Sequence, residues 1–167
     1  MGFVQRNDEE IKMKIIVLPK IKFDREMEKN GWSDNNLPSD KAFISICCNP
    51  IIKKNYLEDH KHKTDEHWFK HNHDNVLNVE FDDIFVPEFE TNYGMAYGIT
   101  DTVAKEIVDF AKKNKDKNEI YIHCMAGKSR SVGVGLALKE YFNCDFSCGA
   151  RWDRYNDFVY NKIKENL

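Results

Sequence analysis

Apolar residues along the chain fall into short runs that are separated by longer and more polar stretches. The runs are nearly continuous rather than alternating, which is typical of strands buried on both faces of a sheet. We expect strands at residues 13–18, 42–48, 76–81 and 119–123. Pro19 ends the first of these strands, because proline cannot donate a hydrogen bond to a sheet.

Between the strands, apolar residues recur at helical spacing. The expected helices are 23–30 (before Gly31), 101–113 (capped by Thr100 or Asp101), 130–142 (stopped by Asn143) and 151–167. The segment 85–98 combines proline, glycine and aromatic residues, and we expect a long loop there, while 144–149 is expected to be irregular.

Strands that alternate with helices predict an α/β fold. We expect one domain, residues 1–167, with a central, mostly parallel sheet of four to five strands flanked by helices. In such sheets the functional site lies at the carboxyl ends of the strands. The predicted strand 119–123 leads directly into the most distinctive stretch of the chain, and the strand 76–81 leads into Asp82 and Asp83.

Composition narrows the possible classes of function. Of the 167 residues, 41% are hydrophobic and 32% charged, as in ordinary folded domains. A net charge of -3 argues against a nucleic-acid partner, and no apolar run is long enough to span a membrane. The N-terminal residues show no hydrophobic signal region, and the five cysteines fit no secreted framework. We therefore expect a cytoplasmic location.

The distinctive stretch is residues 123–131, His-Cys-Met-Ala-Gly-Lys-Ser-Arg-Ser. It lies between a predicted strand and a predicted helix, so the free N–H groups of a tight loop and of a helix N-terminus converge there. The helix dipole favours negative charge at this point. Cys124 begins the loop, and Arg130, whose guanidinium matches phosphate oxygens in pairs, ends it. The stretch predicts an anion site with a nucleophile in it.

The pattern His-Cys-x-x-Gly-x-x-Arg-Ser resembles the phosphate-binding loop of the cysteine-dependent protein tyrosine phosphatases. Its Ala-Gly-x-Ser-Arg-Ser ending is most similar to the small dual-specificity phosphatases of phages and bacteria. In the order of strands and helices the similarity extends from about Ala42 to the end of the chain. It implies a phosphatase-like fold, a phosphorylated protein or peptide as substrate, and catalysis without a metal or cofactor.

The residues themselves and the resemblance assign the same roles. Cys124 is the nucleophile, favoured as a thiolate by the helix N-terminus, and forms a phosphocysteine. Arg130 binds phosphate oxygens and stabilises the transition state. Ser131 donates a hydrogen bond to the sulfur, and His123 orients the loop. The remaining phosphate contacts come from the N–H groups of the loop: Met125, Ala126, Gly127 (whose backbone needs freedom from a side chain), Lys128, Ser129 and Arg130.

Hydrolysis also needs a general acid for the leaving oxygen. In the family this is an aspartate on a loop after a neighbouring strand, a place that Asp83 and, as second choice, Asp82 occupy here. The chain departs from the family pattern, because the family's aspartate usually lies nearer the cysteine in sequence. Glu88 and Glu90 lie closer to that spacing and are also candidates for the acid.

The same residues allow other functions. The run Gly127-Lys128-Ser129 ends like a nucleotide-binding P-loop, but Ile122 stands where that motif needs glycine. A phosphoinositide or nucleic-acid 5′-phosphate phosphatase remains an alternative, because Lys128 is similar to a loop lysine of lipid phosphatases; Met125 replaces their usual second lysine. A non-catalytic module that binds phosphorylated residues is a third candidate. The lack of a deep tyrosine-recognition loop favours the dual-specificity class.

Several further residues have both a structural and a functional interpretation. His67 and His71 would share a helix face, as metal ligands do, but a solvated histidine-rich surface is the simpler interpretation of the stretch 60–73. Cys144 and Cys148 are either core residues or a redox pair. The remaining candidates are Arg151 and Arg154, for an acidic substrate or salt bridges, and Tyr93 and Tyr97, for a pocket rim or packing.

Overall fold

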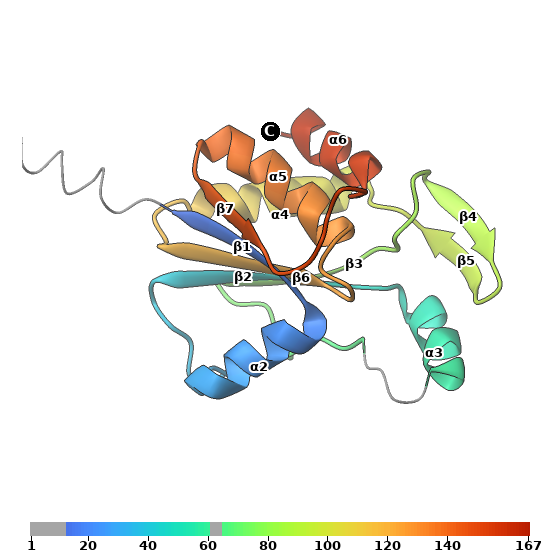
Figure 1. The fold of residues 1–167 in the computed structure, drawn as a ribbon, viewed down its shortest axis with the longest axis horizontal. Helices are drawn as coiled ribbons and strands as arrows, with labels where there is room; N and C mark the ends of the chain where they lie inside the picture. Colours follow the sequence, from blue (N-terminus) through green and yellow to red (C-terminus); the bar gives the residue numbers. More distant parts are fainter. Residues whose placement is uncertain (1–12, 61–64) are drawn as a thin grey trace, which may run out of the picture.

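The structure, a computed structural model, describes residues 13–60 and 65–167. Its centre is a sheet of five parallel strands in the order β3-β2-β6-β1-β7 (Figure 1). The strands are β1 (Lys14–Pro19), β2 (Lys41–Cys47), β3 (Val76–Glu80), β6 (Glu119–Cys124) and β7 (Asp145–Cys148). The predicted α/β fold with a mostly parallel sheet is therefore confirmed.

Helices cover both faces of the sheet (Figure 1). The covering helices are α2 (Lys20–Asn30) on one face and α4 (Asp101–Lys113), α5 (Arg130–Phe142) and α6 (Asp157–Glu165) on the other, while α3 (Pro50–Asp59) lies beyond the end of the sheet. The face with α4, α5 and α6 buries the larger core, while the face with α2 buries a smaller, aromatic one around Phe23 and Phe43. Along β2, Phe43 enters the smaller core and Ile44 the larger one, which explains why the strand is apolar without alternation.

Parallel pairing brings the carboxyl ends of four strands to one edge of the sheet. Pro19 at the end of β1 is in register with Cys124 at the end of β6, and Ser45 of β2 is in register with His123. At the end of β2, Cys47 is in register with Glu80 of β3. The segments that follow these strands therefore meet at a single place, as parallel sheets require of their ligand sites.

The segment expected to be a long loop, 85–98, instead contains an antiparallel hairpin of β4 (Glu88–Thr91) and β5 (Gly94–Tyr97). Its turn is closed by Thr91, whose Oγ1 donates to Gly94 O at 2.7 Å and accepts from Tyr93 N at 3.1 Å. The hairpin packs against α3, where Asn55 Nδ2 donates to Tyr93 O at 2.7 Å. The prediction of a loop was wrong because these local turn bonds and the tertiary support outweigh a weak strand pattern.

Two more expectations are corrected near the C-terminus. The segment expected to be irregular, 144–149, contains β7, which pairs with β1 as an edge strand. The helix expected from Arg151 begins only at Asp157, after Asn156 caps it by accepting from Val159 N at 3.0 Å. A third difference is α3, which begins inside the polar region after Asn49 accepts hydrogen bonds at its first turn. By contrast, the helices 101–113 and 130–142 are confirmed.

Candidate active site

The segment between β6 and α5 forms a tight loop over the end of β1. Residues 125–129 connect the two elements. Gly127 has a φ of +66°, and a Cβ added to it would lie 2.2 Å from Pro19 N. On the same side, Lys20 N donates to Met125 O at 3.1 Å. The loop is thus held against the β1–α2 junction by backbone contacts that only glycine permits at this position.

Cys124 lies at the start of this loop, beside the first turn of α5. Its side chain is 1% exposed, and its Sγ lies 3.1 Å from Ser131 Oγ. A hydroxyl at this distance can donate to a thiolate, and the helix N-terminus favours the negative charge. The structure therefore brings together the predicted nucleophile and the residue predicted to support it.

Arg130, the first residue of α5, extends toward the end of β3. It is only 4% exposed, and its Nη1 donates to Phe81 O at 2.9 Å. Although burial opposes the charge, the neighbouring Cys124 and Asp83 side chains raise the pKa of Arg130 above its usual value. The guanidinium is therefore charged, and its buried Nε has no hydrogen-bond partner among the residues that the structure describes. A buried charged donor of this kind requires an acceptor, which an oxyanion in the loop would supply.

The backbone of the loop offers more donors. In the described part of the chain, no hydrogen bond outside the helices and strands has its donor N–H in residues 125–129. At the helix end, Gly133 N donates to Ser129 O, so the regular ladder of α5 begins only there. Loop amides and the first N–H groups of a helix together form a site for an anion such as phosphate.

Asp83 reaches the rim of this loop from the segment after β3. Its Oδ1 accepts from Ser129 Oγ at 2.7 Å and from Asn156 Nδ2 at 2.8 Å. The residue is exposed, so its carboxylate is accessible from solvent while it contacts the loop. The first-choice acid and the predicted phosphate loop are therefore in contact, although they are far apart in sequence.

Asp82, the second-choice acid, has a different environment. It is 3% exposed, and its carboxylate accepts from both the backbone N–H and the side-chain amide of Asn49 and from Tyr97 N at 2.7 Å. These bonds tie the start of α3 to the hairpin. The two glutamates considered for the acid, Glu88 and Glu90, lie exposed on β4. Of these four carboxylates, only Asp83 lines the pocket beside the loop.

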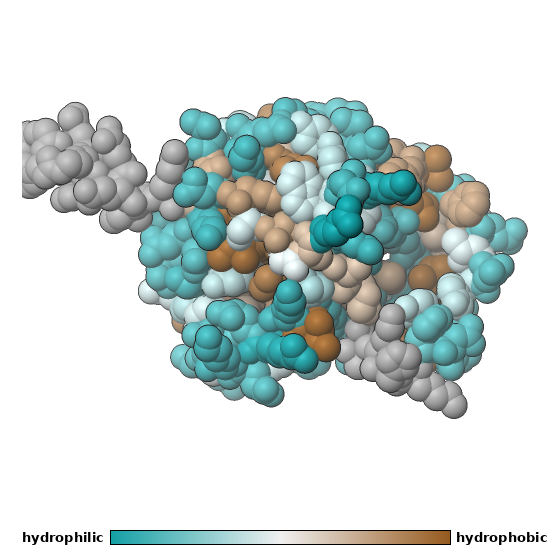
Figure 2. Space-filling model, in the orientation of Figure 1, coloured by the Kyte–Doolittle hydropathy of each residue, from teal (hydrophilic) through white to brown (hydrophobic). Residues whose placement is uncertain are grey.

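That pocket has a volume of about 530 Å³ and lies next to the outer side of the loop. It is lined by Asp83, Phe85, Lys128, Ser129, Arg151, Asp153 and Arg154. Figure 2 shows strongly hydrophilic side chains gathered over the connection between β7 and α6, the segment that supplies the two arginines. Arg151 forms a long ion pair with Asp153, at 3.8 Å, and both are well exposed. The pocket beside the loop therefore combines three cationic side chains with two carboxylates and one exposed aromatic ring.

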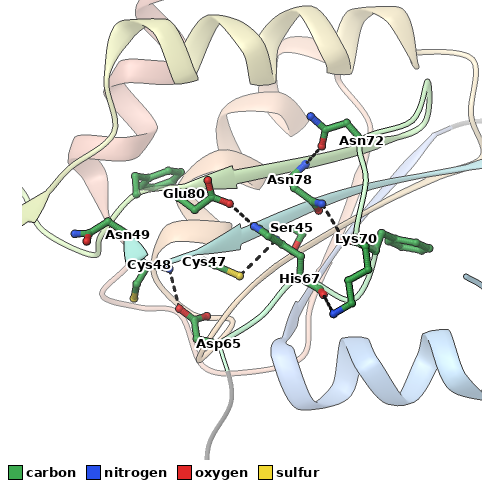
Figure 3. Close-up of polar contacts among 12 residues, drawn as sticks. Ser45, Cys47, Cys48, Asn49, Asp65, His67, Lys70, Asn72, Asn78 and Glu80 are labelled. Carbon is green, nitrogen blue, oxygen red and sulfur yellow. Dashed lines mark hydrogen bonds and ion pairs between the residues drawn. The ribbon is translucent and has the colours of Figure 1, made fainter. Parts of the chain in front are cut away.

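Beneath the loop, His123 is fully buried and packs on the ring of Phe23 at 4.4 Å. Burial, reinforced by the nearby charge of Lys20, lowers the pKa of His123 to about 3, so the ring is neutral. Its Nε2 lies 2.6 Å from Ser45 Oγ, and Ser45 Oγ lies 2.6 Å from His67 Nδ1. Figure 3 shows His67 between Ser45 and Glu80, where its Nε2 contacts the Glu80 carboxylate.

The sequence did not identify this part of the site. One signal was present, because Ser45 is the one hydroxyl in an otherwise apolar strand, and a buried hydroxyl must find partners. Ser45 is fully buried, so the Ser45–His67–Glu80 arrangement cannot act on a substrate as a serine nucleophile would. Its contacts point inward to His123 instead.

The metal geometry considered for the histidine-rich stretch is not found. His67 and His71 do not share a helix face, because residues 65–74 are not helical. His73 pairs with Asp34 at 2.7 Å, and His62 lies outside the described residues. Within residues 13–60 and 65–167, no cluster of three or more metal-ligating side chains occurs.

Two further thiols lie close to the loop. Cys148 is a free thiol whose Sγ donates to Gly127 O at 3.3 Å. Cys48 Sγ lies 3.8 Å from Arg130 Nη1, and burial raises the pKa of Cys48 to about 12 despite that cation. Cys48 is therefore a neutral thiol, which leaves it a poor nucleophile compared with a thiolate.

The site thus joins Cys124, Arg130, Ser131 and Asp83 around one loop and leaves Asp82 in a structural position. None of the helices in the described ranges is both long and apolar enough to cross a lipid bilayer. A comparison of the chain with models of protein families, with curated proteins and with solved structures found no match.

Proposed function

We propose that the chain is a phosphomonoester hydrolase that uses Cys124 as its nucleophile, in the manner of the protein tyrosine and dual-specificity phosphatases. One observation carries the proposal. The Cys124 thiol lies at a helix N-terminus, 3.1 Å from the Ser131 hydroxyl, and interacts electrostatically with the buried Arg130, whose Nε lacks a partner among the described residues. A nucleophile, an oxyanion-binding guanidinium and free amides at one point suit attack on a phosphate ester.

In the first step the Cys124 thiolate attacks phosphorus, and the bond between phosphorus and the ester oxygen breaks. Asp83 gives its proton to the departing oxygen, so that the products are a neutral alcohol or phenol and a phosphocysteine. In the second step Asp83 takes a proton from water, which attacks phosphorus and releases inorganic phosphate. The Ser131 hydroxyl stabilises the departing thiolate, and Arg130 with the loop amides binds the phosphoryl oxygens throughout.

Asp83 can fill this role because of where its carboxylate lies. Its hydrogen bonds to Ser129 and Asn156 hold it at the rim of the loop, while its exposure leaves it open to substrate and water. The donors of both hydrogen bonds, the Ser129 hydroxyl and the Asn156 amide, are neutral, so no fixed positive charge is paired with Asp83 through them. A phosphorylated tyrosine of a protein or peptide would place its ring near Phe85 in the adjoining pocket.

A second candidate within the same chemistry has its own support. Lys128, Arg151 and Arg154 surround the pocket beside Asp83. Their charge favours substrates that carry further anionic groups, such as phosphoinositides or nucleic-acid 5′-phosphates. A non-catalytic phosphate-binding module is less economical, because it would need neither Ser131 beside the sulfur nor an acid at the rim.

The decisive assay uses a small aryl phosphate in the presence of a chelator. The parent chain is expected to release inorganic phosphate, and Cys124→Ser is expected to release none while still binding inorganic phosphate. Arg154→Lys serves as the matched control, because it keeps the charge at the pocket rim. A parent chain without activity would refute the enzyme, and full activity in Cys124→Ser would refute the nucleophile.

A further inference from the structure

A continuous chain of contacts runs from the surface carboxylate of Glu80 to the backbone of Cys124. His67 touches Glu80 through Nε2 and lies 2.6 Å from Ser45 Oγ through Nδ1. Ser45 Oγ lies 2.6 Å from His123 Nε2, and His123 Nδ1 lies 3.4 Å from Cys124 O. The phosphatase chemistry proposed above makes no use of the outer three members of this chain.

The protons of this chain cannot be placed independently. The hydroxyl of Ser45 has one proton, so it donates to one imidazole and must accept from the other. If it donates to His67, then His123 donates through Nε2 and, being neutral, turns an unprotonated Nδ1 toward the carbonyl of Cys124. Two acceptors then face each other. That arrangement loses the last hydrogen bond of the chain.

In the opposite arrangement every contact is a hydrogen bond. Ser45 donates to His123 Nε2, and His123 donates through Nδ1 to Cys124 O. His67 must then donate to Ser45 through Nδ1. Its contact with Glu80 requires one more proton, held either on His67 Nε2 or on the carboxyl group. This arrangement therefore contains one proton more than the first, and that proton lies on the His67–Glu80 pair.

The surroundings favour that location for the proton. His67 and Glu80 are 16% and 46% exposed in their side chains, so water solvates a charge there. His123 is fully buried beside Lys20, and its lowered pKa, about 3, shows that it will not hold a second proton.

Besides Glu80, the titratable groups around His67 come from β2 and from the segment of His67 itself, where Lys70 Nζ donates to His67 O at 3.5 Å. Cys47 on β2 has its Sγ 3.4 Å from His67 Nδ1, and burial raises the pKa of this thiol, which keeps it neutral. Asp65, on the same segment as His67, directs its Oδ2 to Cys48 N at 2.8 Å. Glu80 is therefore the carboxylate that contacts the ring directly.

We propose that Ser45, His67 and Glu80 are positioning residues for the phosphate-binding loop: a proton held by the His67–Glu80 pair fixes His123 as its Nδ1–H tautomer, which donates to Cys124 O. Loss of that proton releases the hydrogen bond beneath the nucleophile. The effect on catalysis rests on the proposed function, but the coupling between the two histidines does not.

The coupling is tested by long-range proton–nitrogen spectra of the histidine side chains of the full chain across pH. In the parent, His123 is expected to carry its proton on Nδ1 at low pH and to change to the Nε2–H form as the His67–Glu80 pair deprotonates. In Glu80→Gln the change is expected at lower pH, because the charged ring loses its carboxylate. Asp34→Asn, which breaks the comparable pair with His73, is the control and leaves His123 unchanged.

A His123 tautomer that is the same in the parent and in Glu80→Gln at every pH would overturn the proposal. Ser45→Ala interrupts the chain of contacts in its middle, so the tautomer of His123 should no longer depend on the protonation of His67. Should this buried variant fail to fold, the exposed Glu80→Gln variant still decides the outcome.

The consequence for catalysis is tested by the pH dependence of aryl phosphate hydrolysis. The alkaline limb of kcat is expected to move to lower pH in Glu80→Gln, with about a 10-fold loss on that limb, since a slightly displaced reactive group costs up to about 100-fold. KM should change little, and Asp34→Asn should follow the parent. Identical profiles would refute the positioning role, whereas a chain inactive at every pH would refute the phosphatase and leave the spectra to judge the coupling.

Discussion

The ends of β6 and β3 both contribute to the site, but they hold their side chains in opposite ways. After β6, the side chains of Cys124 and Arg130 are almost fully buried. Cys124 has its partner, Ser131, in the helix that follows the loop, whereas Arg130 reaches Phe81 O and Cys48 at the ends of β3 and β2. After β3, Asp82 is buried and bound, while its neighbour Asp83 is exposed and contacts residues far along the chain. The Cys124–Ser131 pair is thus formed within one short stretch of sequence, whereas the position of the Asp83 carboxylate depends on the tertiary fold.

The largest effect is expected from a substitution of Arg130, the buried cation that follows β6. In Arg130→Lys the planar fork is lost, and a single ammonium nitrogen cannot present paired, coplanar N–H groups to two phosphate oxygens while it donates to Phe81 O. We expect kcat/KM for aryl phosphate to fall by about 1000-fold, the upper cost of removing one transition-state donor. Steady-state kinetics measure it. Arg154→Lys, at the exposed rim, should lose almost nothing, and equal losses in both variants would contradict the distinction.

The two neighbouring aspartates provide the sharpest test. Asp83→Asn should lower the turnover of an alkyl phosphate by about 100-fold or more, because general acid catalysis is removed. Its thermal stability should stay close to that of the parent. An aryl phosphate, whose leaving group needs less protonation, should suffer less.

Asp82→Asn should show the reverse pattern. Its carboxylate accepts from Asn49 and Tyr97, and an amide would turn donors toward donors, so unfolding by denaturant should become easier by about 2–3 kcal/mol. The fraction that remains folded should keep its turnover number. If the two variants exchanged these phenotypes, the acid would be Asp82.

Gly127 tests the contact between the loop and β1. In Gly127→Ala the new Cβ would lie 2.2 Å from Pro19 N, on a residue with a φ of +66°. We expect a loss of about 2 kcal/mol in the free energy of unfolding and weaker binding of inorganic phosphate, measured by denaturation and calorimetry. Gly94→Ala in the hairpin is the counterpart: its φ of +113° is also positive, but its Cβ would meet side-chain rather than backbone atoms, Ile51 Cγ2 at 3.3 Å and Asn55 Nδ2 at 3.8 Å. That variant should leave phosphate binding intact.

The last prediction concerns a dependence of stability on pH that originates at His123. Because the folded-state pKa is about 3, below the ordinary value of 6.5, the unfolded chain binds the proton more tightly. The resulting contribution is complete above about pH 6.5 and is lost as pH falls toward 3, by at most about 1.4 kcal/mol per pH unit. Denaturation series over this window should be flatter for His123→Gln. A parallel slope in parent and variant would assign the dependence to the carboxylates.

The sequence could predict the parts of the site that depend on local contacts better than those that depend on the tertiary fold. Cys124, Arg130 and Ser131 lie within one turn of loop and helix, so their spacing alone places them together. The strands were predictable because burial on both faces leaves an unbroken apolar run. Of the carboxylates, only contact with Ser129 and Asn156 distinguishes Asp83 from Asp82, and adjacent residues carry no such signal.

The missed elements have a common physical origin. β7 is a short edge strand whose pairing with β1 determines its conformation, and the hairpin relies on turn bonds at Thr91 and on support from α3. The chain from Glu80 to His123 joins three strands, so no local pattern reveals it. In each case the deciding partner lies elsewhere in the sequence.

Asn156 belongs to two systems at once. Its side chain begins α6 by accepting from Val159 N, and the same side chain donates to Asp83 Oδ1 and Ile84 O. Its own backbone N–H donates to Ser129 O in the loop. Turnover can therefore report whether the C-terminal helix is docked. An antibody or a fused tag that displaces α6 from the core should abolish catalysis before the sheet itself unfolds.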